Sequence, residues 1–127
     1  MKNKAVLDAS ALLTLIHEEP GKDVVKSVLA DAVISMVNLC ETSTVLQRKY
    51  DQFTSQKILR WLDIDAIPFN KEQADIAANL NGQTQQHGLS LGDRACLALG
   101  IILQAPVFTA DKVWKKLDLS IAVNLIR

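Results

Sequence analysis

Residues 5–10 are Ala-Val-Leu-Asp-Ala-Ser and residues 106–111 are Pro-Val-Phe-Thr-Ala-Asp, and these two stretches decide the fold. Each is a short apolar run followed by an acid, with a hydroxyl residue two positions from that acid. In a parallel α/β sheet, the ligand crevice lies at the carboxyl ends of the strands. We therefore expect Asp8 and Asp111 to project side by side at one edge of a sheet.

Strand-like and helix-like patterns alternate along the chain, which predicts a parallel sheet covered by helices on both faces. The expected strands are residues 4–8, 32–36, 64–68, 106–109 and 120–124. The expected helices are residues 10–18, 22–30, a helix opened by Asn38, and residues 54–62, 71–86, 91–103 and 112–117. These elements form an α/β fold, a three-layer α/β/α sandwich of about five strands, and residues 1–127 suffice for a single domain.

The composition narrows the class of protein. Fourteen basic and 14 acidic residues give a net charge of zero, which argues against a general electrostatic grip on nucleic acid. No apolar run approaches the roughly 20 residues of a membrane span, and the amino terminus does not have the pattern of a signal peptide. Cys40 and Cys96 lie in apolar helical patterns and fit no zinc motif, so we expect two reduced core residues in a cytoplasmic protein.

Two further acids, Glu41 and Asp93, occur near expected helix starts, which face the same sheet edge as the two strand-end acids. All four acids have an ordinary explanation. Glu41 follows Asn38, and Asp93 follows Ser90, at the spacing of a capping box, and a strand-end acid can cap the helix after it. In this interpretation the acids only stabilise helix starts.

The alternative interpretation is a carboxylate cluster that binds a metal. Carboxylates gathered at one edge raise one another's pKa and weaken the fold unless a cation is present. Mg²⁺ or Mn²⁺ suits such oxygen ligands, and a pair of these ions is a standard device for phosphodiester hydrolysis. With four acids set aside as ligands, 14 basic residues stand against 10 acidic ones, so the neutral total does not exclude an RNA substrate.

Other chemistries lack their motifs. The chain has no glycine-rich nucleotide loop and no nucleophile elbow, and His17 and His87 are too scattered for a zinc site. A receiver-like domain needs an acid after its third strand, which here ends in Ile67-Pro68-Phe69. A haloacid-dehalogenase-type phosphatase needs Asp-x-Asp after its first strand, whereas this chain has Asp8-Ala9-Ser10.

The ordered set of motifs resembles that of PIN domains, and most closely the small ribonuclease toxins of bacterial VapBC toxin–antitoxin pairs. The resemblance spans the whole chain and rests on Asp8-Ala9-Ser10, Glu41, Leu91-Gly92-Asp93-Arg94 and Thr109-Ala110-Asp111. It implies the sheet order 3-2-1-4-5, which places the two strand-end acids side by side. It also implies a cytoplasmic endoribonuclease that depends on Mg²⁺ or Mn²⁺, forms a homodimer and is blocked by a small antitoxin.

The resemblance also implies the roles of individual residues. Four acids are expected to bind the metal and take part in catalysis: Asp8, Glu41, Asp93 and Asp111. Two hydroxyl residues, Ser10 and Thr109, are expected to support the site by hydrogen bonds. We expect Asp8 and Asp93 to be direct ligands, whereas Asp111 can also act through water.

Two basic residues lie next to site acids and are candidates for binding RNA phosphates: Arg94 and Lys112. Arg94 departs from the commonest family pattern, in which an alanine follows the third acid. A charged residue that opens a buried helix needs a partner, and Glu41 or Asp93 would serve.

Exposed apolar residues on the first two helices and around Trp61 or Trp114 would form the dimer or antitoxin surface, although core packing explains many of them equally well. Two other functions stay open: a non-catalytic PIN-like module that binds RNA or protein, and a PIN nuclease of RNA maturation or one that acts on DNA. The presence of all four acids favours catalysis, and the small size favours a toxin.

Overall fold

The computed structural model describes residues 4–127 and contains one all-parallel, five-stranded sheet. Its strands are β1 (Ala5–Leu7), β2 (Ala32–Ser35), β3 (Asp65–Ile67), β4 (Val107–Thr109) and β5 (Val123–Leu125). Their order is β3-β2-β1-β4-β5, which confirms the expected topology. Residues 1–3, part of the amino terminus considered above for a signal peptide, lie outside the described residues.

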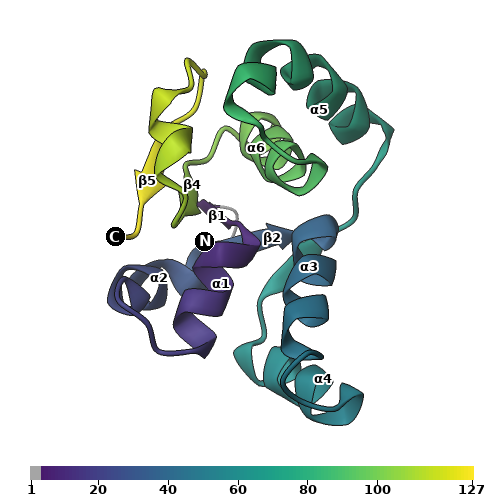
Figure 1. The fold of residues 1–127 in the computed structure, drawn as a ribbon, viewed down its shortest axis with the longest axis vertical. Helices are drawn as coiled ribbons and strands as arrows, with labels where there is room; N and C mark the ends of the chain where they lie inside the picture. Colours follow the sequence, from purple (N-terminus) through teal and green to yellow (C-terminus); the bar gives the residue numbers. More distant parts are fainter. Residues whose placement is uncertain (1–3) are drawn as a thin grey trace.

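Six α-helices surround the sheet (Figure 1). They are α1 (Ala9–Ile16), α2 (Lys22–Val28), α3 (Met36–Leu46), α4 (Gln52–Leu62), α5 (Lys71–Thr84) and α6 (Leu91–Leu103). Three short 3-10 helices complete the chain: η1 (Leu29–Asp31), η2 (Gln85–His87) and η3 (Lys112–Lys116). Between residues 4 and 127, none of these helices has the length and apolar character needed to span a bilayer.

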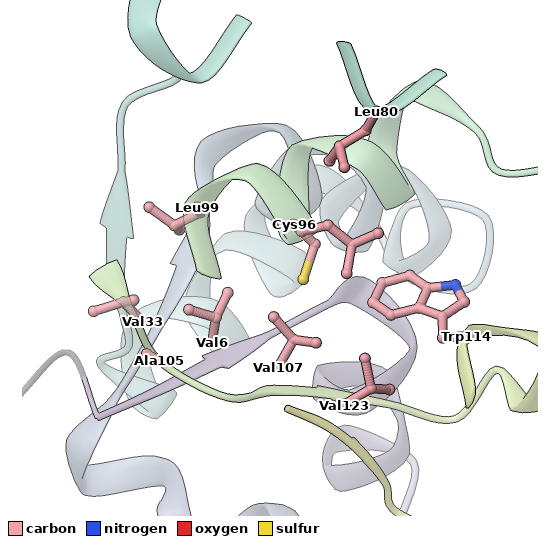
Figure 2. Packing of buried hydrophobic residues seen from close by; sticks show 10 residues of the cluster. Val6, Val33, Leu80, Cys96, Leu99, Ala105, Val107, Trp114 and Val123 are labelled. Carbon is pink, nitrogen blue, oxygen red and sulfur yellow. The ribbon is translucent and has the colours of Figure 1, made fainter. Parts of the chain in front are cut away.

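Side chains of the central strands alternate between the two faces of the sheet, as the pleat requires. Val6 points into one core, which lies under α5 and α6 and includes Val33, Val107 and Cys96. Figure 2 shows this core, in which strand valines lie below the Cys96 and Leu99 side chains of α6. One face of the sheet is therefore covered by α5 and by α6, and α6 carries Asp93 in its first turn.

The opposite face of the sheet forms a second core. Ala5 and Leu7 of β1 pack there with Leu12 of α1 and Val25 of α2. Leu59 of α4 borders the same cluster. Figure 1 shows α1 and α2 on the side of the sheet away from α5 and α6. These two cores complete the predicted three-layer arrangement.

Two predictions about the core and the surface are wrong. Trp114, considered as part of a partner surface, is completely buried and packs with Leu80 and Val123 at the edge of the first core. Cys40, expected in the core, is exposed on α3, whereas Cys96 is buried as expected. In each case the apolar pattern of a short helix did not reveal which side faces the sheet.

Several element boundaries also differ from the prediction, among them the starts of α3 and β5. Helix α3 begins at Met36, because Ser35 at the end of β2 is already the cap and its Oγ accepts a hydrogen bond from the Val37 N–H at 3.2 Å. Asn38 is therefore inside the helix and is not its cap. Strand β5 begins at residue 123, because its ladder starts opposite Val107 of the short strand β4.

Candidate active site

The carboxyl ends of β1 and β4 lie side by side at the point where the strand order reverses. Leu7 pairs with Phe108, and the Asp8 N–H donates to the Phe108 carbonyl at 3.2 Å. The next residues, Asp8 and Thr109, therefore project at the same edge. This is the topological switch point, where ligands bind in open α/β sheets.

Two hydroxyl groups hold the Asp8 carboxylate. The Thr109 hydroxyl donates to Oδ2 at 2.6 Å, and the Ser10 hydroxyl donates to Oδ1 at 2.7 Å. The same hydroxyl oxygens accept backbone N–H groups of the β4 end, from Asp111 to Thr109 and from Ala110 to Ser10, both at 3.0 Å. The hydroxyls therefore tie Asp8 to the segment that carries Asp111.

Asp8 is an acid in a dry environment, with 5% of its surface exposed. Burial raises the pKa of Asp8 from 3.8 to about 6, because desolvation disfavours the charged form. The hydrogen bonds from Thr109, Ser10 and the Ala11 N–H lower this pKa in part, and the negative charge of Asp93 raises it. Asp8 also caps α1 through that Ala11 N–H, at 2.8 Å. The capping role and the place in a carboxylate cluster therefore coexist.

Asp93 likewise combines two properties. It forms a full capping box with Ser90, in which Oδ2 accepts from the Ser90 N–H at 3.0 Å and the Ser90 Oγ accepts from the Asp93 N–H at 3.2 Å. Its side chain is half-buried, at the start of a helix in which residues 95–100 are all buried. This capping box was predicted correctly, and it orients Asp93 at the opening of α6.

Glu41 reaches the same place from α3, which packs against α6. Glu41 is the sixth residue of α3, so it lies in the second turn of the helix and not in the first. Its carboxylate rests on the backbone of Gly92, so closely that any β-carbon at position 92 would overlap it. Asn38 donates to Glu41 Oε1 at 2.8 Å. Only glycine at position 92 leaves room for this approach.

Three of the four predicted acids lie close enough to the buried thiol of Cys96 to affect its pKa. Burial raises the pKa of this thiol well above its usual range, and the negative charges of Asp8, Asp93 and Glu41 raise it further. Carboxylates from the end of β1, the start of α6 and the middle of α3 therefore share one neighbourhood. No pattern around residue 96 in the sequence indicated this meeting point.

Asp111 has a different setting from the other acids. It is exposed, and its Oδ1 accepts from the Val113 N–H at 3.0 Å, which makes it the cap of η3. Its backbone N–H is fixed by Thr109. Lys112, the first residue of η3, is exposed beside it. Asp111 therefore borders the cluster with its side chain turned toward its own helix.

Arg94 does not form the expected ion pair with Glu41 or Asp93. Its Nη1 donates to the Ala77 carbonyl on α5 at 2.9 Å, and its Nε is buried and lacks a hydrogen-bond partner within residues 4–127. The guanidinium lies toward α5 because the tight packing of α6 against α5 offers a backbone acceptor there. Arg94 thus links the start of α6 to its neighbouring helix.

The acids of this site present only some of the ligands that a divalent cation requires. Within the described part of the chain, no three carboxylate, imidazole or thiol side chains are arranged so that they could jointly hold one metal ion. Mg²⁺, however, usually takes one or two carboxylates from a protein and keeps several waters. The neighbouring acids offer only oxygen donors, and burial makes the charged form of the Asp8 carboxylate unfavourable. These groups fit Mg²⁺ or Mn²⁺.

A parallel sheet with acids at its switch point defines a class of α/β proteins whose chemistry lies at the strand ends. A family model describes one such class, the PIN domain, and it matches residues 5–119. The chain belongs to the PIN-domain family. PIN domains are generally nucleases.

Solved structures with the same fold come from toxin–antitoxin systems. VapBC2 from Rickettsia felis, crystallised with a promoter DNA fragment, is 15% identical, covers 95% of this chain and 97% of its own, and has a TM-score of 0.77. VapBC from Salmonella typhimurium is 11% identical, with full coverage of both chains and a TM-score of 0.78. VapBC-5 from Mycobacterium tuberculosis is 20% identical, covers 98% of both chains and has a TM-score of 0.63. At these identities the likeness establishes the fold. A comparison with curated protein sequences gives no match.

Asn38 is the residue of this site that sequence reasoning misplaced. Its position three residues before Glu41 was interpreted as a helix cap, but the side chain is buried at 1% exposure and contacts both Glu41 and Gly92. The contact with Gly92 joins residues 54 positions apart. A polar residue at a position with core-like spacing was the only signal in the sequence.

Proposed function

We propose that this protein is a metal-dependent endoribonuclease and the toxin of a type II toxin–antitoxin pair. The observation that carries the proposal is the arrangement of acids at the switch point of a PIN domain, where the buried Asp8 is hydrogen-bonded to the end of β4 and Glu41 lies against Gly92, the residue before Asp93. A carboxylate buried at 5% exposure and near the negative charge of Asp93 is costly to a fold. A role in cation binding and catalysis would explain why an acid occupies position 8 despite this cost.

Pairs drawn from Asp8, Glu41 and Asp93 would hold Mg²⁺ or Mn²⁺ together with waters, with Asp111 acting through water. When bound, such an ion supplies a Lewis acid that lowers the pKa of water and offsets the charge of a phosphate. Ser10 and Thr109 keep the Asp8 carboxylate in one orientation through their hydrogen bonds. The proposed reaction is in-line attack of water on an RNA phosphodiester, without a covalent enzyme intermediate.

For substrate binding we propose an exposed cation that is next to a site acid in the sequence. We assign Lys112, next to Asp111, to an RNA phosphate, because it is exposed and has no ion pair among the interactions described for residues 4–127. Arg94 donates to the backbone of α5. We therefore propose that its main role is to position the start of α6, and that direct contact with RNA is a lesser role.

The test is cleavage of total RNA by the purified protein, in Mg²⁺, in Mn²⁺ and in EDTA. We expect discrete fragments that require metal and disappear with Asp93→Asn, while Asp75→Asn on the exposed face of α5 cleaves normally. The absence of cleavage by a folded wild-type protein in either metal would leave a binding module. Metal-dependent cleavage of DNA in preference to RNA would reassign the substrate.

An apolar groove supports the proposed antitoxin partner. Helices α1, α2 and α4 line a groove of about 380 Å³, whose apolar walls include Leu15, Leu29 and Ile58. Trp61 stands at its edge with 83% of its surface exposed. Such a groove suits the apolar face of an amphipathic segment, with Glu18 and Lys26 as a charged rim.

Co-purification with a short protein encoded by a neighbouring gene tests this partner. We expect the complex to suppress RNA cleavage and Trp61→Ala to release the partner without loss of cleavage. A complex that survives Trp61→Ala and protects another surface from hydrogen exchange would move the partner away from the groove. From the family resemblance we also propose that the protein is cytoplasmic and forms a homodimer. Sedimentation of the purified chain would show whether it is a dimer.

A further inference from the structure

Asn38 connects two of the elements that build the site. Its amide Nδ2 donates to Glu41 Oε1 at 2.8 Å and to the Gly92 carbonyl oxygen at 2.9 Å. Both hydrogens of the amide are therefore used, one within α3 and one across to the first turn of α6. A rotated amide would lose both bonds, so the orientation of this side chain is defined by its two acceptors.

The two contacts restrain a side chain that would otherwise be mobile. Glu41 is exposed, and a glutamate has several rotatable bonds whose freedom is costly to remove. Its carboxylate lies between the Asn38 amide and the Cα of Gly92, where any β-carbon would collide with it. Asp93 is the next residue along the chain. Asn38 and Gly92 thus bring the Glu41 carboxylate to the side of Asp93.

The remaining polar atom of Asn38 has no protein partner. Asn38 is 1% exposed, and its Oδ1 has no hydrogen-bond donor among residues 4–127. A buried acceptor of this kind is normally satisfied by an ordered water or a ligand group.

We propose that Asn38 is a positioning residue, which holds the Glu41 carboxylate beside Asp93 so that the pair binds a divalent cation. This inference rests on the proposed metal-dependent function and adds to it a residue outside the four acids. Asn38 acts through Glu41 and need not touch the substrate. Partners of metal ligands commonly change metal affinity by 10–100-fold when they are removed.

The first test is Mn²⁺ binding to the folded, RNA-free protein, measured by calorimetry or by electron paramagnetic resonance. We expect Asn38→Leu, which has a similar shape and no donor, to bind Mn²⁺ roughly 10-fold or more weakly. The matched control is Gln73→Met on α5. Gln73 is similarly buried, donates to the Pro68 carbonyl at 2.9 Å and also has an unpartnered carbonyl oxygen among residues 4–127, but its amide makes no hydrogen bond to an acid.

A combined variant tests whether Asn38 acts through Glu41. In a Glu41→Gln background, we expect Asn38→Leu to have no further effect on Mn²⁺ affinity, because the restrained ligand is already altered. Full additivity of the two changes would overturn the positioning role. A wild-type protein that binds Mn²⁺ while Asn38→Leu binds it equally well overturns this inference and leaves the proposed function. A wild-type protein that binds no Mn²⁺ overturns both.

Gly92→Ala supplies a second variant that leaves no buried hole if Asn38→Leu does not fold. The added β-carbon would displace the Glu41 carboxylate, so we expect a similar loss of Mn²⁺ affinity. Gly82→Ala is its control, because Gly82 lies in α5 with no atom within 4 Å of an added β-carbon. Both changes favour helix formation, so equal folding with a loss only in Gly92→Ala is the expected result. Unchanged Mn²⁺ affinity in Gly92→Ala would contradict the proposal.

Discussion

Asp8 shows at the scale of one residue how a structural and a chemical role can share one side chain. It caps α1, accepts two hydroxyl groups and is nearly excluded from water. The hydrogen bonds favour its charged form, but desolvation outweighs them and the pKa rises to about 6. The folded protein therefore binds the Asp8 proton more tightly than the unfolded chain does.

We expect the metal-free protein to lose stability as the pH rises from about 4 to about 6. The unfolded chain releases the Asp8 proton near pH 3.8, whereas the folded protein keeps it up to a pH of about 6. Stability from this group is thus fully present below the window and is lost through it. The rise in pKa from 3.8 to about 6 corresponds to roughly 3 kcal/mol.

Urea unfolding in EDTA, at several pH values for wild type and Asp8→Asn, measures this effect. The neutral amide does not titrate, so the difference in unfolding free energy between the two proteins should change across the window in favour of the variant. In Asp8→Asn, the amide NH₂ group replaces one of the two oxygens that accept a hydroxyl. The loss of this hydrogen bond changes the stability of the variant by an amount that does not depend on pH. A difference that stays the same from about pH 4 to about pH 7 would contradict the prediction.

At the scale of elements, the prediction succeeded where local signals and long-range packing agree. Helix α6 was predicted with both ends correct, because Ser90 caps it and an unbroken buried run follows. The start of α3 was missed because Ser35 belongs at once to the end of a strand and to a cap. The role of Asn38 was missed because its second acceptor, on Gly92, is remote in sequence.

Removal of the cap of α6 should affect both stability and metal binding. We expect Ser90→Ala to lower the free energy of unfolding by about 1 kcal/mol, because the Asp93 N–H loses its acceptor. Asn70→Ala, at the cap of α5, should cost a similar amount because the Gln73 N–H loses its acceptor. Mn²⁺ affinity should fall only in Ser90→Ala, whose first turn carries Asp93. Equal Mn²⁺ affinity in the two variants would separate the cap from the site.

At the scale of the whole molecule, the two tryptophans define opposite environments. Trp114 is completely buried in the core under α5 and α6, whereas Trp61 is 83% exposed beside the groove of α4. From the sequence, a partner surface and core packing were both open for the residues around the two tryptophans. The structure places Trp114 within the first core and leaves Trp61 on the solvent-facing side of α4.

The two tryptophans should therefore respond differently to truncation. We expect Trp114→Ala to cost about 3–5 kcal/mol, since it leaves a large cavity among Leu80, Cys96 and Val123. Trp61→Ala should change stability by no more than about 0.5 kcal/mol. Chemical unfolding of the two variants measures both values. A large loss in Trp61→Ala would mean that the groove is part of the fold and not a free surface.

The hydroxyl bridge between Asp8 and Thr109 spans 101 residues of sequence, and this has a consequence for the time at which the chemistry begins. During translation, Asp8 leaves the ribosome early, whereas the end of β4 leaves it late, with β5 the only strand still to follow among the described residues. Until residue 109 has left the ribosome, Asp8 has no partner across the sheet and the reactive edge does not exist. A chain interrupted before residue 109 lacks the hydroxyl that holds Asp8, so we expect such a fragment to be inactive. Under the proposed function, the site therefore forms only after the sequence from β1 through β4 has been synthesised.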